Sequence, residues 1–362
     1  MKYSGIGGQA VIEGIMMRNR DRYAVAVRKP DGEIAVKVDE CVPYSERFAL
    51  AKVPFIRGSF SFVESMVLGM KTLMYSASFY EDDEEEEPSK FELWLEKVFG
   101  DKLDKVIMTG AMVIAFILAL VIFMWLPLFL AGFVKRFIVS ETLQALLEGA
   151  LRVVIFIFYI MLVSRTEDIR RTFMYHGAEH KCINCIEHGL PLNVDNVAVS
   201  SKEHKRCGTS FIIIVMIISI LFFMVIRVHN PILRLASRIV LMPVIAGVSY
   251  EFLRLAGRSD NPVVNLFSKP GLCMQKLTTY EPDDSMIEVA IAATEAVFDW
   301  KKYQAEEFPG GPDALGLKLA EKAAARHVGA NAAKEAKAQA AGPQREASDA
   351  QETAQEGQDQ TA

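Results

Sequence analysis

The chain has 362 residues, 51% of them hydrophobic, and a mean hydropathy of +0.20. This apolar content exceeds that of an ordinary soluble domain and is concentrated between residues 106 and 253, which predicts a membrane protein whose first partner is the lipid bilayer. Forty basic against forty-five acidic residues give a net charge of −5, which argues against nucleic acid as a partner.

Residues 1–80 are predicted to form a small N-terminal α+β domain in the cytoplasm. Two segments rich in β-branched residues, 23–28 and 33–38, flank the turn sequence PDG and predict two strands joined by a turn. A helix is expected over 58–77, with apolar residues on or near one face: Phe60, Val63, Val67, Met70 and Met74. The start, MKYSGIGGQAVIEG, has no apolar signal-peptide core, so the N-terminus is expected inside the cell.

Residues 81–105 are expected to comprise an acidic linker, EDDEEEEPS, and an amphipathic helix on the membrane surface. Residues 106–253 then predict a membrane domain of four spans, at 106–130, 143–163, 210–226 and 232–253. The first and third spans contain no charge. The second contains Glu148 and Arg152, whose i,i+4 spacing predicts an ion pair. The fourth has a short uncharged centre and leaves a buried or re-entrant helix open.

The connection 164–209 carries an excess of basic residues: Arg165, Arg170, Arg171, Lys181, Lys202, Lys205 and Arg206. Because such excess marks the cytoplasmic side, this loop and both termini are expected inside a multi-pass plasma-membrane protein. Residues 254–304 are expected to dock on the N-terminal domain. Residues 305–362, rich in Ala, Gln and Glu, are expected to be a disordered tail. The predicted fold class is therefore an α-helical polytopic membrane protein with a small α+β domain.

The cytoplasmic loop contains the sequence His176-Gly-Ala-Glu179-His180, which matches the inverted zincin motif H-x-x-E-H. On a helix, the two histidines lie one turn apart on one face and can chelate one zinc ion. Glu179 lies close enough to that face to activate water. A zincin also needs a third protein ligand, for which Glu251 is a candidate because it emerges from the fourth span on the same side.

An overlapping pattern, Cys182-x-x-Cys185 followed by His204-x-x-Cys207, is similar to a structural zinc ribbon. Four such ligands would close the coordination sphere and leave the metal inert. The two patterns could hold separate metals, or one site could combine members of both. Five of the chain's eleven His and Cys residues, His176, His180, Cys185, His204 and Cys207, cluster within thirty-two positions. This clustering favours metal binding over packing and leaves open whether the metal is catalytic or structural.

Several strings of the chain resemble, in order, the YqhQ-like family of bacterial membrane proteins, a domain of unknown function (1385): GGQAVIEGIMMR, RGSFSFVESM, YHGAEHKCINC, HKRCGTSF, SYEFLRLAGR and EPDDSMIEVAIAA. The resemblance runs to about residue 300. It implies a bacterial inner-membrane protein with a suspected metal and a predicted metal-dependent activity, and it assigns no substrate. The polar positions that it implies are His176, Glu179, His180, Cys185, His204 and Cys207. Threonine is common in the family where this chain has Cys182, which favours a mixed His/Cys site over the ribbon.

The expected function is a zinc-dependent hydrolase at the cytoplasmic membrane face, acting on peptide bonds. Glu179 is the expected general base, and the candidate metal ligands are His176, His180, His204, Cys207, Cys185 and Glu251. Cysteine and histidine ligands favour zinc or iron over magnesium. The alternative is a non-enzymatic membrane scaffold in which zinc only holds the loop together.

Overall fold

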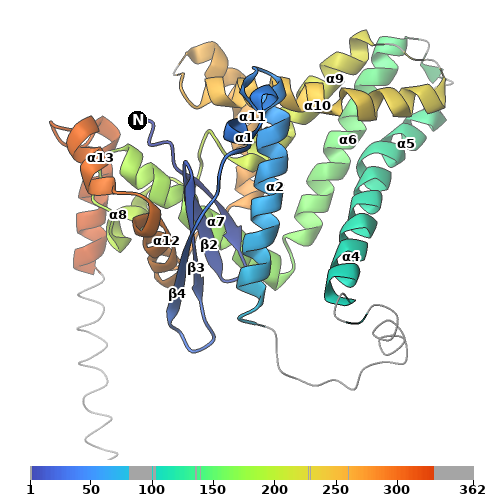
Figure 1. The fold of residues 1–362 in the computed structure, drawn as a ribbon. Coiled ribbons are helices and arrows are strands. Elements are labelled where there is room, and N and C mark those ends of the chain that lie inside the picture. The colour runs from blue at the N-terminus through green and yellow to red at the C-terminus, as the bar shows by residue number, and fades with distance from the viewer. Residues whose placement is uncertain are drawn as a thin grey trace, which may run out of the picture.

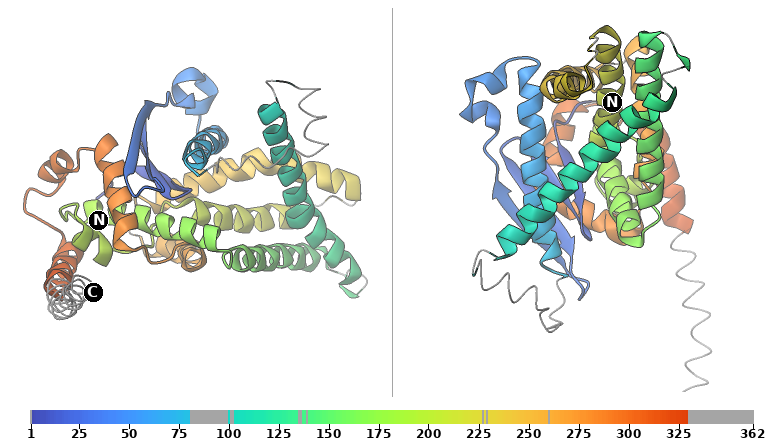
Figure 2. Two further views of the ribbon diagram at one scale, coloured as in Figure 1. Left: turned by 90° about the horizontal axis from the view of Figure 1, so that it is seen from below. Right: turned by 90° about the vertical axis from the view of Figure 1, so that its right-hand side faces the viewer.

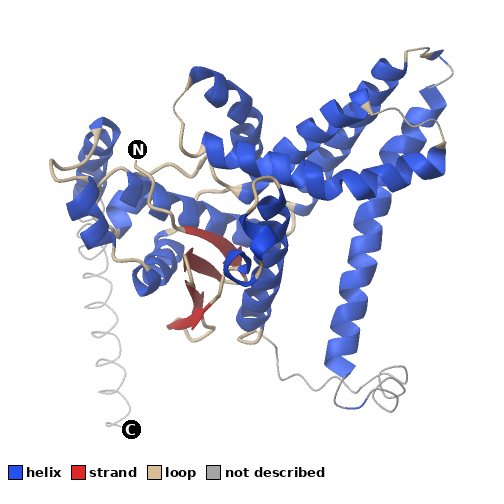
Figure 3. Ribbon diagram, turned by 45° about the horizontal axis from the view of Figure 1, so that its top comes forward, coloured by secondary structure: helices blue, strands red, loops and turns tan. Residues whose placement is uncertain are grey.

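Helices predominate, and the strands gather in one small sheet (Figure 3). The computed structural model describes residues 2–80, 100, 103–134, 137–138, 140–226, 228, 230–259 and 261–329. The predicted linker and surface helix fall almost wholly outside the described residues, as does the chain beyond residue 329. Figure 1 shows the sheet and its covering helices on one side and the long helices α4, α5 and α6 on the other.

The sheet is antiparallel, with strand order β1-β2-β3-β4 and bounds Gly7–Val11, Gly14–Asn19, Arg22–Arg28 and Ile34–Glu40. The predicted hairpin is confirmed as β3 and β4, paired from Arg22↔Glu40 to Arg28↔Ile34. The sequence did not predict β1 and β2, because their glycines are poor strand formers. The tight β1–β2 connection places Glu13 at a φ of 47°, and its carboxylate is held by Arg171 and by the hydroxyl of Tyr175.

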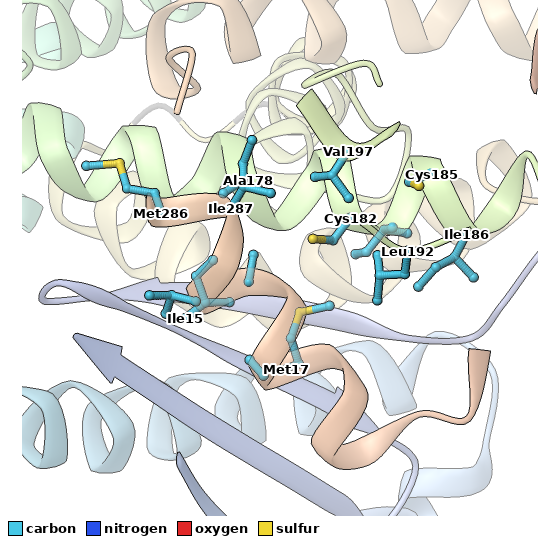
Figure 4. Packing of buried hydrophobic residues seen from close by; sticks show 14 of the residues in the cluster. Ile15, Met17, Ala178, Cys182, Cys185, Ile186, Leu192, Val197, Met286 and Ile287 are labelled. Carbon is cyan, nitrogen blue, oxygen red and sulfur yellow. The ribbon is translucent and has the colours of Figure 1, made fainter. Parts of the chain in front are cut away.

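The two faces of the sheet pack against different helices. On one face, Ile15 and Met17 of β2 lie in the main core with α7 (Glu167–Glu187) and α12 (Asp284–Val297), as Figure 4 shows. On the other face, Met16 packs with Leu68 of α2 (Ile56–Ala77). This follows from the alternation of side chains along a strand. The sheet therefore fixes α7 and α2 relative to each other.

Within the described residues, four helices are long and apolar enough to cross a membrane, judged by length and composition: Thr109–Val134, Glu141–Val163, Gly208–Val225 and Ala236–Ala256. The first joins α4 (Leu103–Leu120), a π-helical turn (Val121–Trp125) and α5 (Leu126–Val134), and the others correspond to α6 (Glu141–Val163), α9 (Gly208–Val225) and α10 (Pro231–Ala256). The helix α9 packs between α6, α10 and α11 (Pro262–Thr278), and Figure 2 shows α6, α9 and α10 side by side. Their apolar surfaces suit a lipid environment.

The predicted ion pair inside the second of these helices is confirmed, and it is part of a larger buried group. Arg152 lies 3.5 Å from Glu148, and its guanidinium also donates to Ser219 of α9 at 3.2 Å. Arg238 of α10 pairs with the same carboxylate. Two arginines and one glutamate thus join three of the apolar helices.

The helix α2 confirms the predicted helix, but the apolar face proposed from the sequence is largely exposed. The residues that it buries are Gly58, Glu64, Leu68, Thr72 and Ser76. By contrast, Val63 is 49% exposed, Met66 59% and Val67 57%. This reversed arrangement is typical of a helix surrounded by lipid rather than by water. Short helices α1 (Tyr44–Arg47) and η1 (Ala49–Lys52) precede it.

Near the C-terminus, α12 packs against β2, β3 and α7, and α13 (Trp300–Glu307) follows it. The N-cap of α12 is Asp283, whose side chain accepts a hydrogen bond from the backbone N–H of Met286. The tail was expected to be disordered from residue 305, but residues 314–329 are helical and Leu319 is buried in the main core. Leu319 packs into the main core, Arg326 of the same helix pairs with Asp195 and Asp284, and Asp313 before it lies 2.8 Å from His188.

Candidate metal centre

The H-x-x-E-H motif lies in the second half of α7, where nearly every residue is buried. Helical spacing brings the rings of His176 and His180 together edge-on, with their centroids 4.4 Å apart. Position 177 requires glycine, because the carbonyl oxygen of Tyr280 approaches so closely that an added Cβ would lie 2.1 Å from it. Cys207 reaches the same point as the N-cap of α9.

Three donor atoms converge there. The ring nitrogens of His176 and His180 and the sulfur of Cys207 all lie within 4.8 Å of one another, and Cys207 Sγ is 3.2 Å from His176 Nε2. Donors at about 2.0–2.3 Å from a tetrahedral zinc ion lie about 3.5 Å apart. A small contraction of the cluster would therefore complete three ligand bonds.

Both histidine rings are oriented by backbone carbonyls. His176 Nδ1 lies 2.9 Å from the carbonyl oxygen of Thr278, and His180 Nδ1 lies 2.7 Å from that of Lys202. A carbonyl only accepts, so Nδ1 carries the proton of each neutral ring and Nε2 presents its lone pair to the cluster. Histidines that bind metal ions in proteins commonly show this arrangement.

In the metal-free site the same groups form an ion pair, and a bound metal ion would take the place of the proton on His176 Nε2. Burial opposes a negative charge on Cys207, but the neighbouring rings of His176 and His180 outweigh it and hold the pKa of the thiol well below its usual range. Burial likewise opposes a positive charge on His176, yet the sulfur of Cys207 raises the pKa of that ring to about 9. The thiolate is the form of cysteine that binds metal ions.

Glu179 stands beside the cluster and is 4% exposed. Its carboxylate lies 3.9 Å from His176 Nε2, the atom directed to the cluster. Strand β1 packs directly over it, because a Cβ added to Gly8 would lie 3.0 Å from Glu179 Cγ and 2.5 Å from the carbonyl of Met16. The carboxylate is therefore close to a bound metal ion without belonging to the three-donor set.

The other candidate ligands have different partners. His204 Nε2 lies 3.5 Å from the carboxylate of Glu187, and burial lowers the pKa of the ring. Cys185 lies in the main core, where burial raises the pKa of its thiol to about 12, and its Sγ lies 3.5 Å from the carbonyl of Pro191. Glu251 accepts two hydrogen bonds from Arg57 and one from the backbone of Phe55. The structure thus brings His176, His180 and Cys207 together and holds these three apart from them.

Cys182 also lies in the main core, and burial raises the pKa of its thiol well above the usual value. The four residues of the zinc-ribbon pattern are therefore not brought together.

Two positioning residues were missed in the sequence. The side-chain amide of Gln275, on α11, accepts from the backbone N–H of His204 at 2.8 Å and donates to its carbonyl at 2.7 Å. This clamp fixes the segment that leads to Cys207. Thr209 places its hydroxyl 2.8 Å from Cys207 Sγ. The spacing C-x-T could have indicated that Thr209 lies beside Cys207, whereas no local pattern in the sequence indicates the role of Gln275.

A cavity of about 510 Å³ opens onto the cluster, with His176, Glu179, His180 and Cys207 in its wall. Volumes of this order are typical of small-molecule sites. The wall also includes Arg18 of β2 and Glu64 of α2, which form an ion pair. The cluster is therefore accessible to a substrate.

Comparison with known proteins agrees with the earlier resemblance. Residues 53–300 match a family described as "Protein of unknown function (DUF1385)". The chain is 35% identical over 287 residues to "Uncharacterized protein YqhQ" of Bacillus subtilis (strain 168), an alignment that covers 79% of this chain and 89% of that protein. No solved structure matches the chain. Because the family match spans most of the chain, this protein belongs to the DUF1385 family, which was called the YqhQ-like family above.

Proposed function

We propose that the protein is a membrane-embedded, zinc-dependent hydrolase with its site at the cytoplasmic membrane face. The observation that carries this proposal is the shared orientation of His176 and His180. Each ring binds a backbone carbonyl through Nδ1 and turns Nε2 toward Cys207 Sγ. Two imidazoles and a thiolate form a donor set that favours zinc or iron.

Three protein ligands, rather than four, support catalysis over a purely structural role. Catalytic zinc sites hold the metal through three side chains and keep one position open, whereas structural sites are closed by four. His204, the nearest additional ring, has its centroid 5.7 Å from that of His180 and pairs with Glu187. The scaffold alternative would need such a fourth ligand to turn into the cluster.

A bound zinc ion would supply Lewis acidity, which polarises a substrate carbonyl and lowers the pKa of water. The chain's own residues supply the proton transfer and the positioning. Glu179, buried and 3.9 Å from His176 Nε2, can take a proton from the attacking water and later return it to the leaving group. Arg18, paired with Glu64 in the cavity wall, can orient a polar substrate group. A peptide bond near the membrane surface is the first substrate class that the motif suggests.

The orientation in the membrane is part of the same proposal. The cluster lies between α7 and the start of α9, within the loop that carries the excess of Lys and Arg. By the positive-inside rule this loop, and with it both termini, belongs in the cytoplasm of a bacterial cell.

The test combines metal analysis with one substitution. The purified full-length protein should contain about one zinc ion per chain, with two nitrogens and one sulfur as protein ligands by X-ray absorption spectroscopy. Glu179→Gln should keep this zinc and lose about 10²- to 10⁴-fold of the cleavage rate on a quenched-fluorescent peptide anchored to vesicles. Glu167→Gln, at an exposed position on the same helix, is the matched control. Unchanged cleavage in Glu179→Gln, or a fourth protein ligand on zinc, would contradict the hydrolase.

A further inference from the structure

A second cavity of about 620 Å³ adjoins the first, and its wall is mostly apolar. The apolar side chains come from four helices, α2, α7, α9 and α10. They include Met66 and Met70 of α2, Phe173 of α7, Phe211 and Ile212 of α9, and Leu253 of α10. A cavity of this size and lining suits a hydrocarbon group rather than a polar one.

The two cavities meet at the candidate metal centre. Both are lined by His176, Arg206 and Gly208, and both reach Gly8 and Gln9 of β1. One cavity therefore offers ion pairs such as Arg18–Glu64 to a polar group, and the other offers apolar walls to a chain. The cluster lies at their junction, which is where a bond between a polar and an apolar part of a substrate would be cleaved.

The apolar cavity also borders two of the candidate membrane spans. Two of its walls, α9 and α10, contain helices long and apolar enough to span a membrane. A third wall, α2, buries small and polar residues and exposes an apolar face that includes Met66 and Val67. These apolar surfaces beside the candidate spans suit the hydrocarbon chain of a membrane lipid.

We infer that the substrate is a long-chain acyl amide or ester that enters from the membrane, with its hydrocarbon chain in the apolar cavity and its carbonyl at the metal centre. This substrate class rests on the proposed hydrolase function. Water adds to the acyl carbonyl carbon and the carbon–nitrogen or carbon–oxygen bond breaks. The acyl part leaves as a carboxylic acid, and the amine or alcohol takes the remaining proton through Glu179.

Occupancy of the cavity can be tested without metal or catalysis. The probe is a phosphatidylcholine with a diazirine near the end of one acyl chain, in nanodiscs that hold the full-length, metal-free protein. We expect photolabelling of Phe173, because this residue lines the cavity but lies on α7, outside the candidate spans. Labelling confined to the outward faces of the spans would overturn the inference. So would labelling of Phe173 by a vesicle-anchored peptide probe and not by the lipid.

One substitution should close the cavity. Gly69 lines it, and an added Cβ meets only the end of the flexible Gln9 side chain, so Gly69→Phe can fill the space within an intact helix. Gly69→Phe should lose most of the labelling at Phe173. Val67→Phe, which adds the same ring at a 57% exposed position of the same helix, should keep it. Met66→Trp, at another exposed lining position, provides a second closing variant if Gly69→Phe fails to fold.

The metal-loaded protein then tests the reaction. Wild type should cleave the N-palmitoyl form of a fluorogenic amide at least about tenfold faster in kcat/KM than the N-acetyl form. Gly69→Phe should abolish this preference while retaining N-acetyl cleavage, and Val67→Phe should retain it, which separates the cavity from simple partitioning into lipid. Labelling of Phe173 without cleavage of either form would reject the hydrolase and its acyl substrate and leave a lipid-binding cavity. N-acetyl cleavage without labelling would keep the hydrolase and reject the acyl substrate.

Discussion

The sulfur of Cys207 lies 3.2 Å from Nε2 of His176, although the two residues are separated by 31 positions and belong to different helices. The contact joins the buried helix α7, which packs on the sheet, to the N-cap residue of a candidate membrane span. The candidate metal centre thus lies where the sheet-containing part meets the apolar helices.

Metal binding should protect one cysteine from alkylation. Cys207 lines the polar cavity, Cys273 is exposed and Cys185 is buried in the main core. We expect iodoacetamide to modify Cys273 and Cys207 in metal-free protein but only Cys273 after zinc is added, as measured by peptide mass spectrometry. Cys185 should stay unmodified in both states of the folded protein. Equal modification of Cys207 with and without zinc would contradict its assignment as a ligand.

The two neighbouring histidines should differ in their effect on zinc affinity. His180→Ala removes one of three donors and should reduce the affinity beyond the 10–100-fold that a change outside the ligand set typically costs. His204→Ala, which alters a ring paired with Glu187, should cost no more than this range. Competition with a chromophoric chelator measures both. Similar losses in the two variants would mean that His204 moves in as a ligand.

Two adjacent glycines of β1 form a matched pair. In Gly8→Ala the new Cβ would lie 2.5 Å from the carbonyl of Met16 and press on Glu179, so we expect a loss of about 1–3 kcal/mol in the free energy of unfolding. In Gly7→Ala the new Cβ meets nothing within 4 Å, and the change should stay within about 0.5 kcal/mol. Chemical unfolding in detergent gives both values. A stable Gly8→Ala variant would show that β1 does not pack tightly on α7.

Acid should weaken the fold through Glu187, which is fully buried. Burial opposes its ionisation, but the hydrogen bond with His204 and the charge of Arg206 hold its pKa at about 2, against 4.5 without these contacts. Since the folded-state pKa is the lower one, its contribution of about 3 kcal/mol is present above pH 4.5 and is lost as the pH falls toward 2. Glu187→Gln should therefore be destabilised at pH 7, and the gap to wild type should narrow below pH 4.5. Glu306→Gln, at an exposed position, serves as the control for thermal unfolding scans.

The buried charge group of the apolar helices should be sensitive to loss of its only carboxylate. Glu148→Gln leaves Arg152 and Arg238 without their countercharge and should cost about 3–5 kcal/mol of unfolding free energy. Arg152→Gln should cost less, because the pair of Glu148 and Arg238 remains. Unfolding by sodium dodecyl sulfate in mixed micelles measures the two variants. An equal or smaller loss in Glu148→Gln would show that water or another residue compensates the arginines.

Much of the local structure could be predicted from the sequence, because it depends on neighbouring residues. Uncharged stretches marked the long helices, and the i,i+4 spacing of Glu148 and Arg152 marked their contact. The hairpin of β3 and β4 followed from residue type and the PDG turn. The strand β1 could not be recognised, since glycine is a poor strand former and the close contacts of Gly8 with Met16 and Glu179 arise only in the folded chain.

Tertiary contacts explain where the sequence and the structure differ. The face of α2 that carries Val63 and Val67 is exposed, because Glu64 is drawn inward by Arg18 and the apolar side is left for the surroundings. The helix at 314–329 forms because Leu319 reaches a core assembled from distant segments. Neither the exposed face of α2 nor the docking of the helix at 314–329 can be predicted from the residues of the segment alone.

The sequence by itself determined the composition of the candidate centre, since H-x-x-E-H on one helix necessarily places His176, Glu179 and His180 on neighbouring turns. Only the tertiary structure decided which further residue completes the donor set. The sequence offered four further candidate ligands without distinguishing between them: Cys207, Cys185, His204 and Glu251. Each of them has a different partner in the folded chain. The physical reason is that ligand geometry requires donors within a few ångströms, and for residues tens of positions apart this distance is set by the packing of α7, α9 and α11 and not by spacing along the chain.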